Sequence, residues 1–433
     1  MNIMKKKFNL YIGLAILGLA SSCAPSLDEF EPSKGTADFS KFIAVGNSLT
    51  SGYANNGLYL EGQKVAFPNL IAEQMKAVGG GEFTSPFFSA EQANGTGYIK
   101  LKGLVDGNPV TEQVPAQAVR TTTPQPLFTK YLDPIQNLGV PGMRLDLSLV
   151  AEMSGTAGNP YFERLLPDAA VGKTKYIEYA ASHEHSFFSF WLGNNDVLGY
   201  ATNGAVTTNP TNALINTTTF QFAYSTFIDA LTKGGQKGVV ATIPDVTTIP
   251  FLNTVTTARI NAGVEAKTNG QVKNVVIATK TTPRVATAED RFVLTFPTEK
   301  LGVPDNLGRP YGVHPGNPIE DKYVLDKDEA AQVVSRVNEI NAIIKNIAKS
   351  KDLAVADVHA FLNKVKGGYI YNGVAISSAY ITGNAFSLDG VHLTPMGNAI
   401  VANLFIEAIN KQYKSTIPTV DISNYPGVKF PGE

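Results

Sequence analysis

The sequence predicts an α/β fold in which a mostly parallel sheet is covered by helices on both faces. Short apolar runs rich in β-forming residues alternate with segments whose apolar residues recur every three or four positions. Several apolar runs end in a polar turn, which is typical of strands that carry a site at their carboxyl ends. The chain has no internal repeat and no low-complexity tract. One domain with insertions therefore fits the 433 residues better than two separate domains.

The composition indicates a globular protein that works outside the cytoplasm. Apolar residues make up 43% of the chain, which is enough for a large core, and charged residues only 17%. The 36 basic and 37 acidic residues nearly cancel, so no nucleic-acid partner is expected. Frequent Gly, Pro, Thr and Asn residues indicate long polar loops.

Residues 1–22 have the pattern of a secretory signal peptide. Three lysines at residues 5–7 precede an apolar stretch, residues 8–20, that is too short to span a bilayer as a helix. Small residues then lead to Cys23, the only cysteine, which stands where a bacterial lipoprotein signal places its lipidated residue. We therefore expect an extracytoplasmic protein held by this lipid on a bacterial membrane, with the outer membrane preferred.

An ordinary signal peptide with an incidental thiol is the alternative, because Ala20 replaces the leucine that usually stands three residues before the cysteine. If Cys23 is acylated, no disulfide can form. Residues 23–40 would then be a tether, residues 41–415 the domain and residues 416–433 a C-terminal tail.

The first βα unit carries a serine. Residues 42–45 are apolar β-formers that end at Gly46, and a polar cluster containing Ser48 follows at once. This pattern predicts a buried strand with Ser48 in the turn at its carboxyl end, where ligands bind in open α/β sheets. Residues 68–78 have helical spacing and begin with a proline, so they complete the unit.

The later elements continue the alternation. Strands are predicted within residues 133–140, 180–192, 238–243 and 353–358. Helices are predicted at residues 145–153, 220–233, 329–349 and 394–413.

Two long segments interrupt this pattern and are predicted to be insertions, residues 82–130 and about 250–326. The second has weak strand candidates at residues 272–278 and 291–296. The first insertion would wall the active site or be a passive surface excursion, and the sequence favours neither.

The groups needed for acyl transfer stand at the predicted turns and loops. A serine hydroxyl such as that of Ser48 becomes a good nucleophile only when a base removes its proton. Histidine suits this task, and an aspartate bonded to its other ring nitrogen fixes the tautomer. Asp389 and His392 lie on one short loop and could do both jobs. The Ser48 and Gly142 N–H groups and the Asn195 side chain could stabilise the oxyanion.

Each of these residues also has a purely structural interpretation. Ser48 or Asn195 could cap a helix, and Gly142 could simply permit a turn. Asp389 could form an Asx turn. The functional interpretation gains weight because all of them stand after predicted strands or in one loop.

Four motifs resemble, in order, the four blocks of the SGNH, or GDSL, hydrolase superfamily: GNSL at 46–49, Gly142, GNND at 193–196 and DGVH at 389–392. They span nearly all of the chain after the signal peptide. The resemblance implies a flavodoxin-like three-layer α/β/α sandwich with long loop insertions.

The resemblance also implies the site residues. Ser48 would be the nucleophile, His392 the base and Asp389 its orienting acid. Ser48, Gly142 and Asn195 would form the oxyanion hole, and neither a metal nor an organic cofactor would be required.

Two departures from the family pattern bear on function. Asn47 replaces the usual aspartate before the serine, and the insertions are too long for a substrate class to be carried over. No G-x-S-x-G elbow surrounds Ser48, which argues against an ordinary α/β-hydrolase. We expect a serine esterase that cleaves carboxylic esters of lipids or acylated carbohydrates. The alternative is a non-catalytic glycan- or lipid-binding surface lipoprotein on the same fold.

Other candidate residues have weaker support. His183 and His185 suggest a metal site but lack a third ligand, so we expect surface histidines. Arg144 would contact an anionic or sugar substrate or form a surface salt bridge. His314 would hold a loop or touch substrate, and Trp191 would lie in the core.

Overall fold

A computed structural model describes residues 31–105 and 108–432. The expected signal peptide and Cys23 lie outside the described residues.

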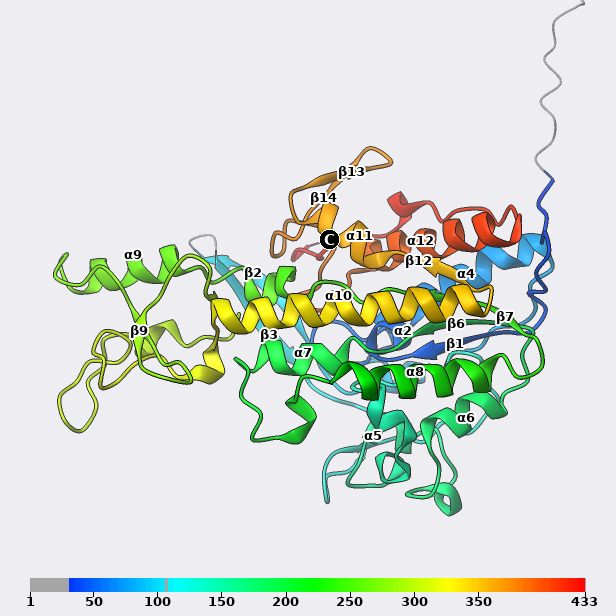
Figure 1. Cartoon of the computed structure of the whole chain (residues 1–433), viewed down its shortest axis with the longest axis horizontal. Coiled ribbons are helices and arrows are strands. Elements are labelled where there is room, and N and C mark those ends of the chain that lie inside the picture. Colours follow the sequence, from blue (N-terminus) through cyan, green and yellow to red (C-terminus); the bar gives the residue numbers. More distant parts are fainter. Residues whose placement is uncertain (1–30, 106–107, 433) are drawn as a thin grey trace, which may run out of the picture. The chain divides into compact units, whose positions relative to one another are not determined.

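The central sheet has four parallel strands in the order β1-β6-β7-β12 (Figure 1). They are β1 (Phe42–Gly46), β6 (Phe187–Trp191), β7 (Lys237–Ala241) and β12 (Ala354–Ala356). On the free side of β1, Ala44 forms a parallel bridge with Asn137. With this segment counted second in the chain, the spatial order is the 2-1-3-4-5 order of flavodoxin-like folds. The predicted fold class is confirmed.

Strand β6 is apolar at every position except Ser189, and its surroundings explain this composition. Trp191 contacts Phe67 and Phe405 on one face of the sheet. Phe190, which points to the other face, contacts Phe227. Both faces of the strand are therefore buried, as expected for a central parallel strand.

Helices cover both faces of the sheet (Figure 1). Helices α4 (Phe67–Met75) and α12 (Pro395–Tyr413) pack together on one face, where α12 contacts β7 and β12. Helices α6 (Tyr176–Ser182), α8 (Thr217–Leu231) and α10 (Lys327–Ser350) contact one another in sequence on the other face. The predicted helices at 220–233, 329–349 and 394–413 are confirmed.

Helix ends are set by capping residues. The Asp326 side chain accepts from the backbone N–H of Glu329, whose carboxylate accepts from the Asp326 N–H, so a capping box starts α10. The Thr394 hydroxyl accepts from the Gly397 N–H at 3.0 Å and starts α12. Because Thr394 stands two residues after His392, this cap also fixes the end of the loop that carries the histidine.

The remaining elements are short. The helices are α2 (Ser48–Ser51), α3 (Leu60–Lys64), α5 (Pro160–Glu163), α7 (Asn195–Thr202), α9 (Thr257–Lys267) and α11 (Val358–Val365). The first insertion holds the antiparallel pairs β2 (Tyr98–Val105) with β3 (Asn108–Val114) and β4 (Val119–Thr121) with β5 (Leu127–Phe128). The second holds β8 (Val276–Ile277) with β9 (Arg284–Val285) and β10 (Arg291–Phe292) with β11 (Val324–Leu325). Strands β13 (Tyr369–Tyr371) and β14 (Val374–Ile376) form a further hairpin.

Two predicted elements are wrong in detail. Residues 133–140 form only the bridge at Asn137 rather than a strand. The helix expected at 145–153 is replaced by two 3₁₀ turns, because Val150 between them is extended, with φ −110° and ψ 118°. Local periodicity could not reveal that extended residue.

The compact unit Ser33–Glu433 is larger than the expected domain. Ala37 and Phe39, in the segment expected to be a tether, are buried in the core. Val420 and Ile422, in the segment expected to be a tail, are buried as well. Residues 33–40 and 416–432 therefore pack as parts of the unit.

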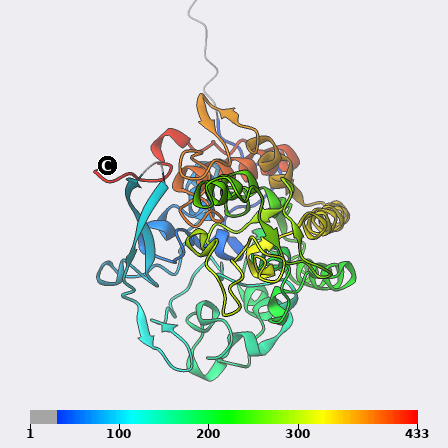
Figure 2. The ribbon, with the colours of Figure 1, turned by 90° about the vertical axis from the view of Figure 1, so that its left-hand side faces the viewer.

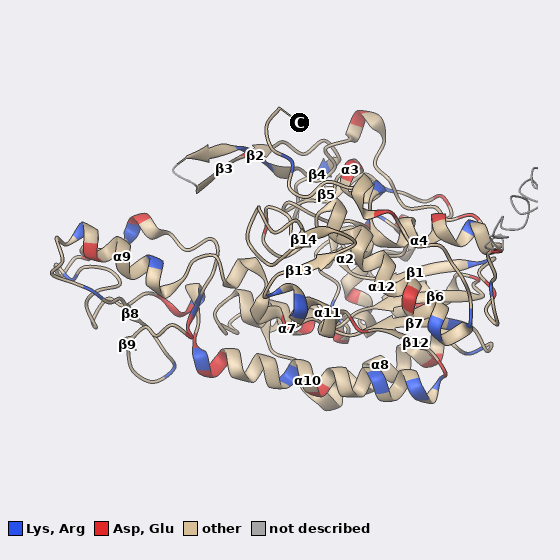
Figure 3. Ribbon diagram, turned by 90° about the horizontal axis from the view of Figure 1, so that it is seen from above, with Lys and Arg blue, Asp and Glu red and all other residues tan. Residues whose placement is uncertain are grey.

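Charged side chains of both signs are interspersed over the ribbon (Figure 3), in keeping with a net charge of −1. Among the described residues, no helix combines the length and the apolar character that crossing a membrane requires.

Candidate active site

Ser48 stands at the carboxyl end of β1, where the chain turns directly into α2. Asn47 is the N-cap of this short helix, and its side-chain oxygen accepts from the Leu49 N–H at 3.1 Å. An amide oxygen performs this capping as well as the carboxylate of an aspartate, which explains how the turn tolerates asparagine. Gly46 is required before it, because a Cβ there would lie 2.0 Å from the Thr50 hydroxyl.

The structure brings Ser48, His392 and Asp389 into one hydrogen-bonded chain. The Ser48 Oγ lies 2.9 Å from His392 Nε2, and His392 Nδ1 lies 2.9 Å from Asp389 Oδ2. Ser48 and Asp389 are buried, and His392 is partly exposed. Such an arrangement can move the serine proton to the imidazole while the carboxylate holds the ring.

Backbone N–H groups surround the Asp389 carboxylate. Its Oδ1 accepts from Val391 N at 2.9 Å and His392 N at 2.8 Å, and its Oδ2 accepts from Asn56 N at 3.0 Å. Burial alone would raise the pKa of Asp389, but the His392 ring and these N–H groups outweigh it and hold that pKa well below its ordinary value. Asp389 is therefore a carboxylate at neutral pH.

The second insertion braces the loop that carries Asp389. Gly390 has a left-handed φ of 70°, and its carbonyl accepts from the Phe251 N–H at 2.9 Å. A Cβ at Gly390 would lie only 2.9 Å from the same nitrogen, so glycine is needed for both reasons. The Tyr380 hydroxyl donates to the Leu388 carbonyl at 2.5 Å on the other side of Asp389.

An aromatic wall lies beside His392. The Tyr53 ring is 4.7 Å from the His392 ring between centroids, and Tyr161 stands next to Tyr53. Phe128, from the first insertion, packs on Tyr161 at 4.9 Å. Burial raises the pKa of Tyr53, so its phenol stays neutral beside the imidazole. The first insertion thus contributes to a wall next to His392.

The segment that carries Gly142 runs alongside the Ser48 turn. The Val140 N–H donates to the Gly46 carbonyl at 3.0 Å, and Gly142 then adopts a φ of 76°, which explains the glycine. In the described part of the chain, neither the Gly142 nor the Ser48 N–H has a protein acceptor. Both donors are available to an oxyanion.

Asn195 joins this segment from the next strand. It is the first residue of α7, after β6, and its Nδ2 donates to the Met143 carbonyl at 2.9 Å. The bond uses one of the two amide protons and leaves the second available. The structure thus places the Asn195 amide beside the Met143–Arg144 peptide, one residue after Gly142.

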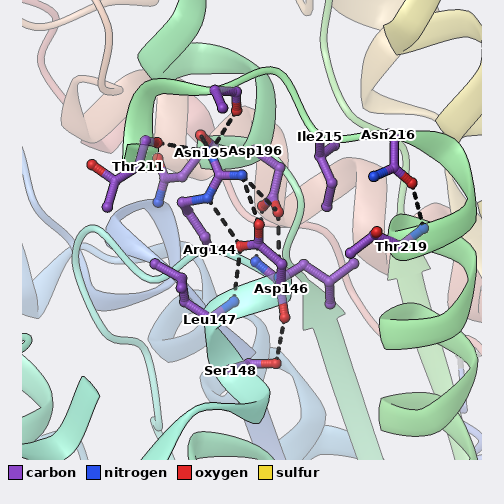
Figure 4. A network of polar contacts seen from close by, with 12 residues as sticks. Arg144, Asp146, Leu147, Ser148, Asn195, Asp196, Thr211, Ile215, Asn216 and Thr219 are labelled. Atoms are coloured by element: carbon purple, nitrogen blue, oxygen red, sulfur yellow. Dashed lines mark hydrogen bonds and ion pairs between the residues drawn. The ribbon is translucent and has the colours of Figure 1, made fainter. Parts of the chain in front are cut away.

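A buried polar network lies behind these donors (Figure 4). Arg144 donates to both carboxylate oxygens of Asp146, at 2.9 and 2.8 Å, and to the carbonyls of Thr211 and Ala213. Asp196, next to Asn195 in the sequence, is fully buried. Its carboxylate accepts from the backbone N–H of Leu145 at 2.8 Å.

The Arg144–Asp196 network links the segment after Gly142 to the start of α7, which carries Asn195. Arg144 Nη2 lies 4.0 Å from the Asp196 carboxylate. Burial raises the pKa of Asp196, and the Arg144 guanidinium opposes that rise. Together the two side chains connect residues 144–146 with the start of α7.

Sequence reasoning missed part of this machinery. Arg144 is buried, so the surface salt bridge is wrong, and its donors are taken up by Asp146 and by backbone carbonyls rather than left for a substrate. Asp196 could have been singled out from the GNND motif, although nothing there shows what it binds. No signal in the sequence pointed to Tyr53 or Asn56.

The other candidates have structural roles. His183 Nδ1 lies 2.8 Å from a carbonyl of its own helix. His185 is buried rather than at the surface, and its Nε2 lies 2.9 Å from the Leu231 carbonyl. His314 accepts from a backbone N–H of its own loop, and Trp191 lies in the core as predicted. No group of three metal-ligating side chains occurs among the described residues.

The sequence profile described as GDSL-like Lipase/Acylhydrolase matches residues 42–405. The chain belongs to this family. The family resemblance predicted from the four motifs is thereby confirmed, and the protein is an ester hydrolase of the GDSL, or SGNH, type.

Comparison with known proteins adds little to the family assignment. No curated protein matches the chain. A lipase/acylhydrolase from Enterococcus faecalis is similar with 12% identity over 88% of this chain and 99% of its own, at a TM-score of 0.34. An acetyl-xylooligosaccharide esterase from Geobacillus is similar with 11% identity over 87% of this chain and 96% of its own, at a TM-score of 0.37. Similarities this weak carry no argument about substrate.

Proposed function

We propose that this GDSL family member is a serine esterase that cleaves carboxylic esters of a lipid or an acylated carbohydrate through an acyl-enzyme on Ser48. The observation that carries the proposal is the hydrogen-bonded chain from Ser48 through His392 to Asp389, with both side-chain contacts at 2.9 Å. A nucleophile in contact with its base, and a base in contact with its orienting acid, is the arrangement that acyl transfer requires.

In acylation, Ser48 Oγ attacks the ester carbonyl carbon as its proton passes to His392 Nε2. The carbonyl oxygen becomes an oxyanion, which accepts hydrogen bonds from the Ser48 and Gly142 N–H groups and from Asn195 Nδ2. When the tetrahedral intermediate collapses, the alcohol leaves with the proton from His392. Asp389 stays ionised throughout and holds the proton-bearing Nδ1 of the ring.

Deacylation repeats these steps with water. A water molecule gives a proton to His392 Nε2 and attacks the acyl carbon, and the same three donors stabilise the oxyanion. Collapse breaks the bond to Ser48, which recovers the proton from His392, and the carboxylic acid leaves. Every proton that moves in these steps passes between Ser48, His392, water and the substrate.

Hydrolysis of p-nitrophenyl esters from acetyl to long acyl chains tests the proposal, with Ser48→Ala beside the wild type. We expect the substitution to lower kcat by about 10⁴-fold or more. Ser182→Ala, which removes an exposed hydroxyl in α6, should leave kcat unchanged. Activity confined to acetyl esters would favour an acylated carbohydrate as substrate, and activity that rises with chain length would favour a lipid.

Labelling by a fluorophosphonate separates the esterase from a non-catalytic binding protein. The probe reacts with an activated serine, so wild type should be labelled and Ser48→Ala should not. An unlabelled wild type without turnover on any ester would contradict the proposal and favour glycan or lipid binding on the same fold.

We further propose that Cys23 carries a lipid that anchors the protein to a bacterial membrane. The support is the signal pattern before Cys23 in the sequence. Mass spectrometry of the protein expressed with its signal should find a lipid-modified Cys23, and Cys23→Ser should leave the protein unmodified and released from membranes. An unmodified thiol in the wild type would contradict the anchor.

A further inference from the structure

A cavity of about 390 Å³ lies next to the catalytic loop but outside the catalytic chain. Its walls are the β2–β3 hairpin, α3, the start of α12 and the C-terminal residues 427–432, which lie beside the hairpin (Figure 2). Among its described lining residues, neither Ser48 nor His392 occurs. Its volume falls in the range of about 300–1,000 Å³ that is typical of small-molecule sites.

The interior of the cavity is apolar. Leu101 from the hairpin and Leu388 from the catalytic loop are buried in one cluster, and Val428 and Phe430 from the C-terminal segment pack against it. Tyr59 lies in the same wall. A surface of this kind gains free energy by covering hydrocarbon.

The charged rim of the cavity is not balanced. Its described lining includes three lysines and two glutamates. Lys100 pairs with Glu112 at 2.7 Å, and Lys429 pairs with Glu61. Lys102 is exposed and forms no ion pair with any of the described residues. Among the described residues, the Lys102 ammonium is therefore the one at this rim that lacks an ion-pair partner.

We propose that this cavity binds an amphipathic carboxylate, with its hydrocarbon chain between Leu101, Leu388 and Val428 and its carboxylate at Lys102. The apolar interior selects the chain and the Lys102 ammonium selects the anionic head. The site is separate from the esterase chemistry and does not depend on Ser48.

The cavity wall is also part of the support of the catalytic aspartate. Asn55 Nδ2 donates to the Tyr59 hydroxyl at 2.8 Å, and Asn55 Oδ1 accepts from the Leu388 N–H at 2.9 Å. The next residue, Asn56, donates its N–H to Asp389. A chain packed on Tyr59 and Leu388 would thus contact the residues that position Asp389, while leaving the serine accessible.

Isothermal titration of the full-length protein with octanoate tests the proposal, and Ser48→Ala is used so that no turnover interferes. We expect one octanoate per chain with a Kd below about 1 mM. Octan-1-ol should bind more weakly because it lacks the charge, and acetate should not bind because it lacks the chain.

Two variants locate the site. Val428→Trp fills the cavity from a half-buried position in the C-terminal segment and should abolish binding. Lys102→Glu reverses an exposed charge, does not threaten folding, and should weaken octanoate by about fivefold without affecting octan-1-ol. The matched control Lys300→Glu reverses an exposed charge in the second insertion and should leave Kd unchanged.

Two outcomes would overturn the proposal. The first is no binding of octanoate at millimolar concentration. The second is binding that survives both Val428→Trp and Lys102→Glu and is lost when wild-type Ser48 is blocked by a fluorophosphonate, because the acid would then occupy the catalytic cleft. The first outcome does not depend on whether the protein hydrolyses esters, and the second requires only that the fluorophosphonate reacts with Ser48.

Discussion

The two halves of the active site are held in different ways. Ser48, His392 and Asp389 are joined to each other by direct side-chain hydrogen bonds. In the other half, Gly142 and Asn195 make no hydrogen bond to Ser48 within the described residues, and they are positioned by the backbone and by the Arg144–Asp196 network.

The difference follows from what each half must do. Groups that exchange a proton must come within hydrogen-bond reach of each other. Oxyanion donors must instead keep an N–H group without a protein acceptor. Their positions therefore have to be fixed by other contacts of the residues that carry them. The buried charges at Arg144 and Asp196 supply that support. We therefore expect kcat to fall most when the directly bonded half is altered and less when the oxyanion half or its support is altered.

The largest loss is expected from the directly bonded half. Asp389→Asn keeps the size of the side chain but presents an amide to His392 Nδ1, which favours the wrong tautomer. We expect kcat to fall by about 10⁴-fold with little change in KM. Steady-state kinetics on a p-nitrophenyl ester measure this, and a fall of less than tenfold would mean that another group orients the histidine.

The oxyanion half should give a smaller loss. Asn195→Ala removes one donor and should lower kcat by about 10²–10³-fold. Fluorophosphonate should still label Ser48, only more slowly, because the triad is untouched. Asn203→Ala, at an exposed position near the end of α7, is the matched control and should behave like wild type. An unchanged kcat in Asn195→Ala would remove this residue from the oxyanion hole.

Changes to Asp196, which supports the oxyanion donors, should lower kcat less than the loss of a donor. Asp196→Ala leaves Leu145 N without its acceptor and should lower kcat by about 10–100-fold through misplaced donors. Asp196→Asn retains an acceptor oxygen and should restore part of the loss. A purely structural role would instead lower thermal stability and leave kcat per folded molecule unchanged in both variants.

The smallest effect concerns pH and stability. The folded-state pKa of Asp389 is depressed, so its contribution to stability is present above the ordinary aspartate pKa of about 3.9 and is lost as pH falls below that value. Denaturant unfolding of wild type and Asp389→Asn should therefore differ in free energy at pH 7, and the difference should narrow steadily as pH falls below about 4. If wild type and Asp389→Asn differed in stability by the same amount at pH 7 and at a pH below about 4, Asp389 would not be an ionised, hydrogen-bonded carboxylate.

The parallel strands and their polar ends were predictable because each depends on a short local pattern. Residues 42–45 and 238–243 are apolar runs before a polar turn, and the structure has β1 and β7 there. The helix expected at 329–349 is α10, Lys327–Ser350, because its apolar residues recur at helical spacing over six turns. The second insertion gave only weak patterns: its strand candidates at 272–278 and 291–296 contain β8 and β10, but α9 was missed.

The sequence by itself determined the order of the four family motifs and the residue types that acyl transfer needs. Only the tertiary structure decided that the Asn56 amide reaches Asp389, that Arg144 donates to the Thr211 carbonyl, and that Tyr53 packs on His392. Local periodicity reports which face of an element is buried, but these contacts join segments that are up to several hundred residues apart in the chain. They arise only when the sheet brings the ends of its strands to one edge.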